Sequence, residues 1–282
     1  MVVGTGDYAS APTLYVAAKC QIPTLIQEQN AVLGLTNKIL ARYANIVCTA
    51  YTNMATPIPF KKTVLTGNPV RKSLMQLNRK REASYEFFDL ASDKKCLLVL
   101  GGSLGARNIN KSISKAIGTL SEAGLQIIWA TGRMYFETIR AQLTKVQMDT
   151  VRIYPFIKAM DLAYAAADIV VSRAGALAVA ELCTVQKPVI FVPSPNVTKD
   201  HQTKNILPLV KDEAALMVTD GEAEPYLAQT ILSLLKLEHQ QKILSKNIRH
   251  WARPNATAAI VQEVVHLASK SPYRPRRNQI VP

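Results

Sequence analysis

The sequence predicts an α/β protein with two parallel β-sheets, each covered by helices. Between residues 94 and 193, short apolar runs such as CLLVL and DIVVS alternate with segments of helical periodicity, and the first 70 residues repeat this alternation on a smaller scale. Nearly continuous apolar runs are typical of parallel strands buried on both faces, and the segments between them are long enough to be crossover helices. A chain of 282 residues, 48% of them hydrophobic, can form two such domains.

The elements follow in order along the chain. In the first region we expect strands at 2–3, 22–26, 46–50 and 63–66. A helix ending near residue 44 is expected to carry one apolar stripe, formed by Val32, Leu35, Ile39, Leu40 and Tyr43. In the second region we expect strands at 96–100, 126–130, 151–156, 168–172, 188–193 and 214–218. We expect crossover helices over 106–120 and 175–185. The C-terminal part should be helical, with Pro225 near the start of one helix.

Three segments are expected. The first domain should span 1–78, with the boundary in the polar stretch that follows residue 72, and the second should span 79–270, with its last helix packing back on the first domain. Residues 271–282 form a basic tail, which we expect to be disordered. Because a strand begins at residue 2 and few strands precede the boundary, we expect the first domain to be incomplete.

Charge and cysteine usage limit the function classes. The formal net charge of +14 indicates an anionic partner, which could be nucleic acid, an anionic lipid surface or a phosphorylated substrate. No RRM, KH, helix-turn-helix or zinc-finger pattern is present, so we expect no nucleic-acid partner. The cysteines, at 20, 48, 96 and 183, form no CxxC pair, so we expect no metal site and a reducing compartment. No segment has the apolar length of a membrane span.

A glycine turn at 101–106 follows the expected strand 96–100 and precedes a helix. Such a turn lets backbone amides and the positive end of a helix approach a phosphate, and the hydroxyl of Ser103 adds a donor beside them. The spacing is not GxGxxG and no Lys-Ser/Thr pair follows, which disfavours a dinucleotide fold and a P-loop. The turn on its own fits a ligand-free bend equally well.

A second turn of the same kind lies at 172–175, ahead of a helix rich in small residues. Glu181 on this helix could accept hydrogen bonds from the paired hydroxyls of a sugar, or could be an ordinary exposed glutamate. Gln202 lies in a loop expected at the same sheet edge, and acid/base work by the neighbouring His201 is disfavoured. Asn30 follows the expected strand 22–26, and Arg71 stands at the expected hinge, where it could contact a ligand between the domains.

Five motifs together carry a family resemblance. They are QEQNAVLGLTNK at 27–38, TGNPVR at 66–71, GGSLGARNIN at 101–110, SRAGALAVAEL at 172–182 and DHQTKN at 200–205. In order and spacing the chain, to about residue 268, resembles the MurG family of undecaprenyldiphospho-muramoylpentapeptide β-N-acetylglucosaminyltransferases. The resemblance implies a GT-B fold of two Rossmann-like domains, and an inverting, metal-independent transfer of GlcNAc from UDP-GlcNAc to lipid I to form lipid II. It implies no cofactor, and a peripheral location on the cytoplasmic face of the bacterial membrane, on an anionic lipid surface.

The resemblance also implies roles for individual residues. It places Ser103 on the diphosphate, Glu181 on the ribose, Arg71 on the donor, and Gln202 and Asn30 near the GlcNAc. Around the uridine it places Ile157 and the segment Ala176, Leu177, Ala178, Val179, Ala180. The chain departs from the family at Asp7, Ala11 and Ala178, which puts phosphate and donor contacts there in question. The family also has an upstream GGTGGH loop whose histidine is a candidate base, so the catalytic base is not identified in this sequence.

Two alternatives stay open at this point. One is another GT-B enzyme that acts on a UDP-sugar, a transferase or an epimerase. The other is a UDP-sugar-binding remnant without full activity, which the expected loss of the upstream loop favours.

Overall fold

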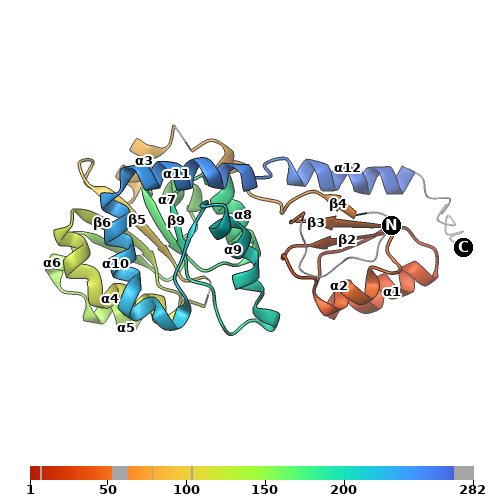
Figure 1. The fold of residues 1–282 in the computed structure, drawn as a ribbon, viewed down its shortest axis with the longest axis horizontal. Helices are drawn as coiled ribbons and strands as arrows, with labels where there is room; N and C mark the ends of the chain where they lie inside the picture. Colours follow the sequence, from red (N-terminus) through yellow and green to blue (C-terminus); the bar gives the residue numbers. More distant parts are fainter. Residues whose placement is uncertain (7, 53–62, 78, 103, 270–282) are drawn as a thin grey trace, which may run out of the picture. The chain divides into compact units, whose positions relative to one another are not determined.

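The computed structural model describes residues 1–6, 8–52, 63–77, 79–102 and 104–269, and it divides into two units. The first unit contains Met1–Pro69 together with the segment from Asn255 onward, and the second contains Val70–Pro254. Each has its own parallel sheet (Figure 1). The α/β class and the parallel arrangement are therefore as the sequence predicts.

The first unit has a four-stranded sheet in the order β1-β2-β3-β4, with every neighbouring pair parallel. Its strands are β1 (Val2–Gly4), β2 (Thr24–Glu28), β3 (Ile46–Thr49) and β4 (Thr63–Leu65), and its helical elements are η1 (Tyr8–Ser10), α1 (Ala11–Lys19), α2 (Leu35–Leu40) and α12 (Ala256–Ser269). All residues of β2 and β3 are buried, including the polar Gln27 and Glu28 of β2, whose side chains are hydrogen-bonded.

The two faces of this sheet pack against different helices. Leu14 and Leu40, on α1 and α2, meet one face. Ile260, Val264 and Leu267 of α12 lie against the other face. These three α12 side chains recur at helical spacing, so one stripe of a C-terminal helix closes the core of the N-terminal unit.

The apolar stripe expected on the helix ending near residue 44 is wrong. Val32 precedes α2 and is buried, and so is Leu40, whereas Leu35, Ile39 and Tyr43 are exposed, with 65% of Leu35 accessible. Leu35 and Ile39 are four residues apart, so they share the helix face that points away from the core. Hydrophobicity alone therefore does not distinguish the buried face of this helix, which carries Leu40, from the exposed face, which carries Leu35 and Ile39.

The second unit has a six-stranded parallel sheet in the order β10-β9-β8-β5-β6-β7. Its strands are β5 (Lys95–Leu100), β6 (Leu125–Ala130), β7 (Val151–Tyr154), β8 (Ile169–Ser172), β9 (Val189–Phe191) and β10 (Leu216–Met217). Its helical elements are η2 (Lys72–Met75), α3 (Arg81–Phe87), α4 (Arg107–Glu122), α5 (Phe136–Gln142), α6 (Lys145–Met148), α7 (Met160–Ala166), α8 (Ala176–Val185), η3 (Thr198–Asp200), α9 (His201–Lys211), η4 (Asp220–Glu222), α10 (Ala223–Lys236), α11 (Glu238–Ile248) and η5 (Arg249–Trp251).

Alternating side chains of β5 enter two separate cores. Leu97 and Val99 pack with α4 and α10 on one face, and Cys96 and Leu98 pack with α7, α8 and α9 on the other. Both faces of the sheet are thus covered, which explains why the strand is apolar at every position after Lys95. This arrangement leaves the carboxyl ends of the strands as the edge where loops can build a site.

The boundary between the units differs from the one expected after residue 78. The unit division falls between Pro69 and Val70, because Leu74 of η2 is buried in the core of the second unit. At the other end, Ala256–Ser269 belongs to the first unit, which is where the last helix was expected to pack.

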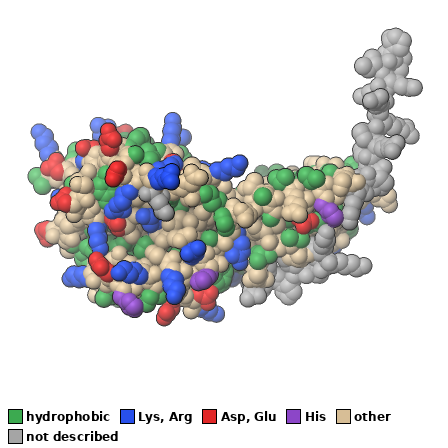
Figure 2. Space-filling model, turned by 90° about the horizontal axis from the view of Figure 1, so that it is seen from above, with side chains coloured by type: hydrophobic (Ala, Val, Ile, Leu, Met, Phe, Trp, Pro, Cys, Tyr) green, Lys and Arg blue, Asp and Glu red, His purple; other side chains and the backbone are tan. Residues whose placement is uncertain are grey.

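Positive charge is distributed rather than gathered on the face that Figure 2 shows. Lys and Arg side chains there are interspersed with Asp and Glu. The sequence places further basic residues at Lys61, Lys62 and in the tail 270–277, which lie outside the described residues. No helix in the described part of the chain has the length and apolarity to span a membrane.

Candidate functional site

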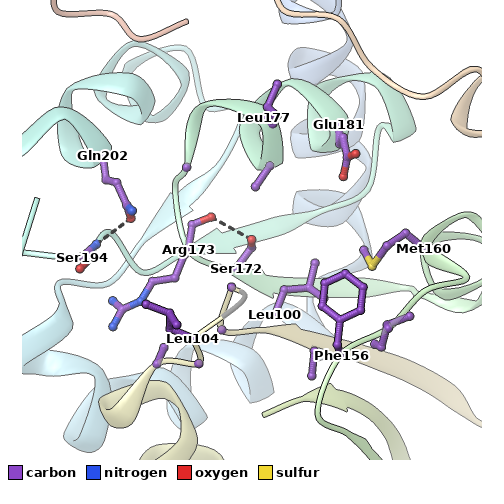
Figure 3. Close-up of a pocket in the computed structure, with 18 of the residues that line it drawn as sticks. Leu100, Leu104, Phe156, Met160, Ser172, Arg173, Leu177, Glu181, Ser194 and Gln202 are labelled. Atoms are coloured by element: carbon purple, nitrogen blue, oxygen red, sulfur yellow. Dashed lines mark hydrogen bonds between the residues drawn. The ribbon is translucent and has the colours of Figure 1, made fainter. Parts of the chain in front are cut away.

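A cavity of about 830 Å³ opens at the carboxyl edge of the second unit's sheet. The turns after β5 and β8, the segment after β7 and the starts of α4 and α8 line it (Figure 3). Three of its side chains, Leu104, Phe156 and Leu177, are apolar and more than half exposed. An open apolar rim above converging backbone turns suits a ligand with an aromatic or sugar part and an anionic part.

The glycine turn between β5 and α4 is shaped mainly by backbone packing. A Cβ on Gly105 would lie 2.4 Å from the carbonyl oxygen of Thr131, and one on Gly132 would lie 2.3 Å from the Cα of Gly105. These two glycines let the turns after β5 and β6 touch. Gly102 also has a positive φ of +83°, yet a Cβ there would meet nothing within 4 Å. Gly102 therefore borders open space, which leaves room for a ligand close to its backbone.

The start of α4 is fixed by a buried hydrogen-bond chain. The indole Nε1 of Trp129 donates to Asn110 Oδ1 at 3.0 Å, and Asn110 Nδ2 donates to the carbonyl of Thr131 at 2.8 Å. Neither α4 nor α8 has a side-chain cap at its first turn within the described residues. Two helix N-termini with uncapped first turns at one cavity favour an anionic ligand. Ser103, predicted to contact the diphosphate, lies outside the described residues.

Glu181 is the acidic side chain at the α8 side of the cavity. Its side chain is 12% exposed, and its carboxylate accepts from Arg71, with Nη2 2.9 Å and Nε 3.0 Å from Oε1. Tyr164 donates its hydroxyl to Oε2 at 3.2 Å. Burial, and next the neighbouring Glu181 carboxylate, raise the pKa of Tyr164 well above its usual value, so the tyrosine stays a donor. These contacts hold Glu181 as an oriented acceptor for a ligand's hydroxyl groups.

A second ion pair joins three loops beside the glycine turn. Arg173 Nη1 and Asp220 Oδ1 lie 2.6 Å apart, with side chains only 15% and 13% exposed. Arg173 also donates to the carbonyls of Val192 and Pro193, and Asp220 accepts from Asn108 of α4 at 2.7 Å. This largely buried arginine therefore stabilises the loops that shape the cavity, since its charge is already paired with that of Asp220.

Gln202 joins two turns across the mouth of the cavity. Its Oε1 accepts from the backbone amide of Ser194 at 2.8 Å (Figure 3). It also accepts from the backbone amide of Ala174 at 3.2 Å. The two hydrogens on its Nε2 remain available as donors, since no hydrogen bond of that group is found among the described residues. Such a donor suits a hydroxyl or carbonyl oxygen of a sugar.

The structure brings most of the predicted residues together. Arg71, Ile157, Leu177, Ala178, Glu181 and Gln202 all line the cavity. Of the rest of the predicted uridine segment, Ala176, Val179 and Ala180 do not line it, and Val179 is buried in the core. Helical geometry explains the split, because positions 177, 178 and 181 share one face of α8 and position 179 points to another.

Asn30 belongs to the first unit. Its backbone amide donates to Glu28 Oε1 at 3.0 Å, and Oε2 of the same buried carboxylate accepts from Gly34 and from Asn37. Glu28 therefore fixes the loop that follows β2. The predicted contact between Asn30 and the donor sugar stays a prediction.

Sequence reasoning missed several cavity residues. Tyr164 and Asp220 support Glu181 and Arg173, but they come from separate segments, α7 and η4, and no local pattern marks them. Arg107 lies inside the quoted GGSLGARNIN motif, so a cation at the start of α4 could have been noticed. Within the described residues, no group of three or more His, Cys, Asp or Glu side chains could hold a metal ion.

Comparison with known proteins gives consistent matches. The model of the glycosyltransferase family 28 C-terminal domain matches residues 96–264, and that of the N-terminal domain matches residues 1–49. A UDP-N-acetylglucosamine–N-acetylmuramyl-(pentapeptide) pyrophosphoryl-undecaprenol N-acetylglucosamine transferase of Christiangramia forsetii is 47% identical over 267 residues, which are 95% of this chain and 72% of that protein.

Solved structures agree with these matches. The crystal structure of Acinetobacter baumannii MurG is 32% identical, with a TM-score of 0.76, over 94% of this chain and 72% of that one. A UDP-GlcNAc 2-epimerase from Neisseria meningitidis shares only the fold, with 14% identity and a TM-score of 0.64 over 94% of this chain and 75% of that one.

Proposed function

The chain belongs to glycosyltransferase family 28, and within it to the MurG N-acetylglucosaminyltransferases, and from this premise we propose how its second unit binds the donor. The protein transfers GlcNAc from UDP-GlcNAc to lipid I and forms lipid II. The GT-B fold and the family predicted from the sequence are confirmed. The epimerase alternative loses its support, because the epimerase shares the fold at only 14% identity.

The donor binds in the cavity that is lined by Glu181 and by the N-termini of α4 and α8. The proposal rests on the presence of this carboxylate and both helix N-termini in one cavity. The diphosphate lies on the first turns of α4 and α8, where backbone amides and two helix dipoles face it. The ribose hydroxyls donate to Glu181, and the uracil lies against Ile157 and the exposed ring of Phe156. Gln202 donates from Nε2 to the GlcNAc.

In the reaction, the bond between the anomeric carbon and the diphosphate breaks while the acceptor hydroxyl attacks that carbon. UDP leaves with added negative charge, and the two helix N-termini stabilise that charge most when it has fully developed. Arg71 is 53% exposed and its ion pair is with Glu181, so it can turn toward the donor at a small cost. The base that takes the acceptor proton is not assigned.

Transfer from radiolabelled UDP-GlcNAc to a lipid I analogue tests this function, and calorimetry with UDP tests the site separately. Glu181→Ala and Gln202→Ala should weaken UDP-GlcNAc, whereas only Glu181→Ala should weaken UDP, because Gln202 is placed on the sugar. Val146→Asp, an exposed change in α6, is the control and should leave both affinities unchanged. Equal effects of the Glu181 and Gln202 variants on UDP would contradict the assignment of Gln202.

Membrane association rests on a separate observation in the first unit. Tyr15, Leu35, Ile39 and Tyr43 are exposed on and beside α1 and α2, and the Lys19 ammonium lies 5.5 Å from the centre of the Tyr15 ring. Exposed apolar side chains beside lysines suit the interface of an anionic bilayer. We therefore propose peripheral binding through this surface.

Sedimentation with vesicles tests the proposal. Ile39→Asp should reduce binding to phosphatidylglycerol vesicles, whereas Val146→Asp, on α6 of the second unit and 77% exposed, should leave it unchanged. Equal loss in both variants, or equal binding to neutral and anionic vesicles, would contradict this surface.

A further inference from the structure

A second cavity, of about 600 Å³, lies at the opposite edge of the second unit's sheet. The first residue of β5 and the segments that precede β8 and β9 line it, together with α11. Its polar side chains include Lys95, Asp168, Gln186, Lys187, Lys242 and Ser245. None of these residues lines the donor cavity, so the function proposed above does not use them.

Lys187 is the central feature of this cavity. It is partly buried just before β9, and among the described residues its ammonium group has neither a hydrogen bond nor an ion pair. The strand register puts Asp168 beside it, but the Asp168 carboxylate already accepts hydrogen bonds from other groups. Both Asp168 oxygens accept from Arg81 at 3.1 Å, and one accepts from the amide of Cys96 at 2.8 Å.

The electrostatics of Lys187 favour an anion beside its ammonium group. Burial lowers the pKa of Lys187, because an ammonium group in this position has lost part of its hydration, and Arg81 acts in the same direction. Asp168 offsets this only in part. An anion bound in the cavity would supply the acceptor that the described part of the chain does not provide.

Other groups around the cavity add donors, although Glu238 and Gln241 also line it. In the described part of the chain, Lys242, Ser245 and Gln186 have no side-chain hydrogen bond or ion pair. The remaining acid, Glu238, lies 3.5 Å from Lys95 and is 70% exposed. Lysine ammonium groups with hydroxyl and amide donors suit a phosphate group, and no aromatic side chain among the described residues lines the cavity to stack on a base.

We propose that this cavity binds the phosphate group of a small, non-aromatic ligand or of a lipid headgroup, through Lys187, Lys242 and Ser245. The site is separate from the donor cavity and does not depend on the transferase activity. The phosphate group can belong to a small ligand or to a lipid headgroup, and the experiment tests each of these two sources separately.

Residue-resolved lysine acylation of the full chain, read by peptide mass spectrometry, tests the site. No lysine lines the described part of the donor cavity, so phosphate bound there does not protect a lysine of that site. Inorganic phosphate at about ten times its dissociation constant should slow acylation of Lys187 about tenfold, relative to chloride at equal ionic strength. Lys145, exposed on α6, is the internal control and should react equally in both salts.

The variants give an independent readout. Lys242→Met and Ser245→Ala should each reduce the protection of Lys187 by phosphate, whereas Lys145→Met should not, and urea unfolding shows whether each variant is folded. Protection by phosphatidylglycerol vesicles but not by phosphate would identify a headgroup as the source. Equal acylation of Lys187 in phosphate, vesicles and chloride would overturn the proposal.

Discussion

Replacing Glu181 tests the orientation of the donor most directly. In the structure the Glu181 side chain is 12% exposed, and its carboxylate accepts hydrogen bonds from Arg71 and Tyr164. A hydrogen bond from a ribose hydroxyl to a charged acceptor contributes about 1.5–3 kcal/mol. Removing a negative charge from a cavity that holds a diphosphate returns ~0.5 kcal/mol through reduced repulsion. The net loss for Glu181→Ala is therefore about 1–2.5 kcal/mol, or about 5- to 70-fold in the dissociation constant of UDP.

Calorimetry with two ligands separates a ribose contact from a general disturbance. UDP and 2′,3′-dideoxy-UDP carry the same charge, but only UDP has the hydroxyl groups that Glu181 is proposed to accept. Glu181→Ala should weaken UDP, whereas the dideoxy compound should bind up to about twofold more tightly, because it gains the ~0.5 kcal/mol of reduced repulsion and loses no hydrogen bond. If both ligands lose affinity by the same factor, Glu181 does not contact the ribose and the reasoning fails.

Tyr164→Phe is the matched control for the support of Glu181. It removes the hydroxyl that donates to Oε2 and keeps the carboxylate and its pair with Arg71. UDP affinity should change by less than about 1 kcal/mol. Urea unfolding is needed for both variants, because Glu181→Ala leaves the fully buried Tyr164 hydroxyl without its acceptor, at about 1–3 kcal/mol of stability.

Further predictions concern the turn and the thiols. Gly132→Ala should destabilise the protein to urea more than Gly102→Ala, since a Cβ at 132 would meet backbone at 2.3 Å and one at 102 would meet nothing; equal losses would contradict this. In the native protein a thiol reagent should label the exposed Cys20 but not the buried Cys96 or Cys183, and rapid labelling of Cys183 would refute its burial. Burial raises the pKa of the Cys96 and Cys183 thiols from 9.0 to about 12, and that of the buried Cys48 thiol to about 11. Stability should therefore fall as pH rises from about 9 toward 12, because the unfolded chain releases these protons first; a flat urea midpoint over this range would count against it.

The sequence predicts β5 well because burial on both faces makes this strand apolar from Cys96 to Leu100. Leu97 and Leu98 enter opposite cores, and both are fully buried. The exposed face of α2 was not predictable in this way, because Leu35 and Ile39 are as apolar as buried residues. The hydrophobic pattern shows which residues are apolar, but the packing of α2 against the rest of the unit decides which of its faces is buried.

The candidate site could be predicted in part. Glu181 and Leu177 stand in a local motif at a strand end, where the topology alone puts them at one sheet edge. Tyr164 and Asp220 act through contacts between segments that are distant in sequence, and local patterns carry no information about such contacts. The boundary at Pro69 depends likewise on the burial of Leu74.

The return of α12 to the first unit affects how the chain folds during synthesis. A ribosome makes β1 to β4 before the second unit, but Ile260, Val264 and Leu267, which cover one face of that sheet, emerge only after the whole second unit. Residues 70–254 can therefore complete their fold while the earlier sheet still exposes Leu25, Ile46 and Cys48. We expect that a chain ending at Pro254 would keep this apolar face open and aggregate through it, while its second unit retained its fold.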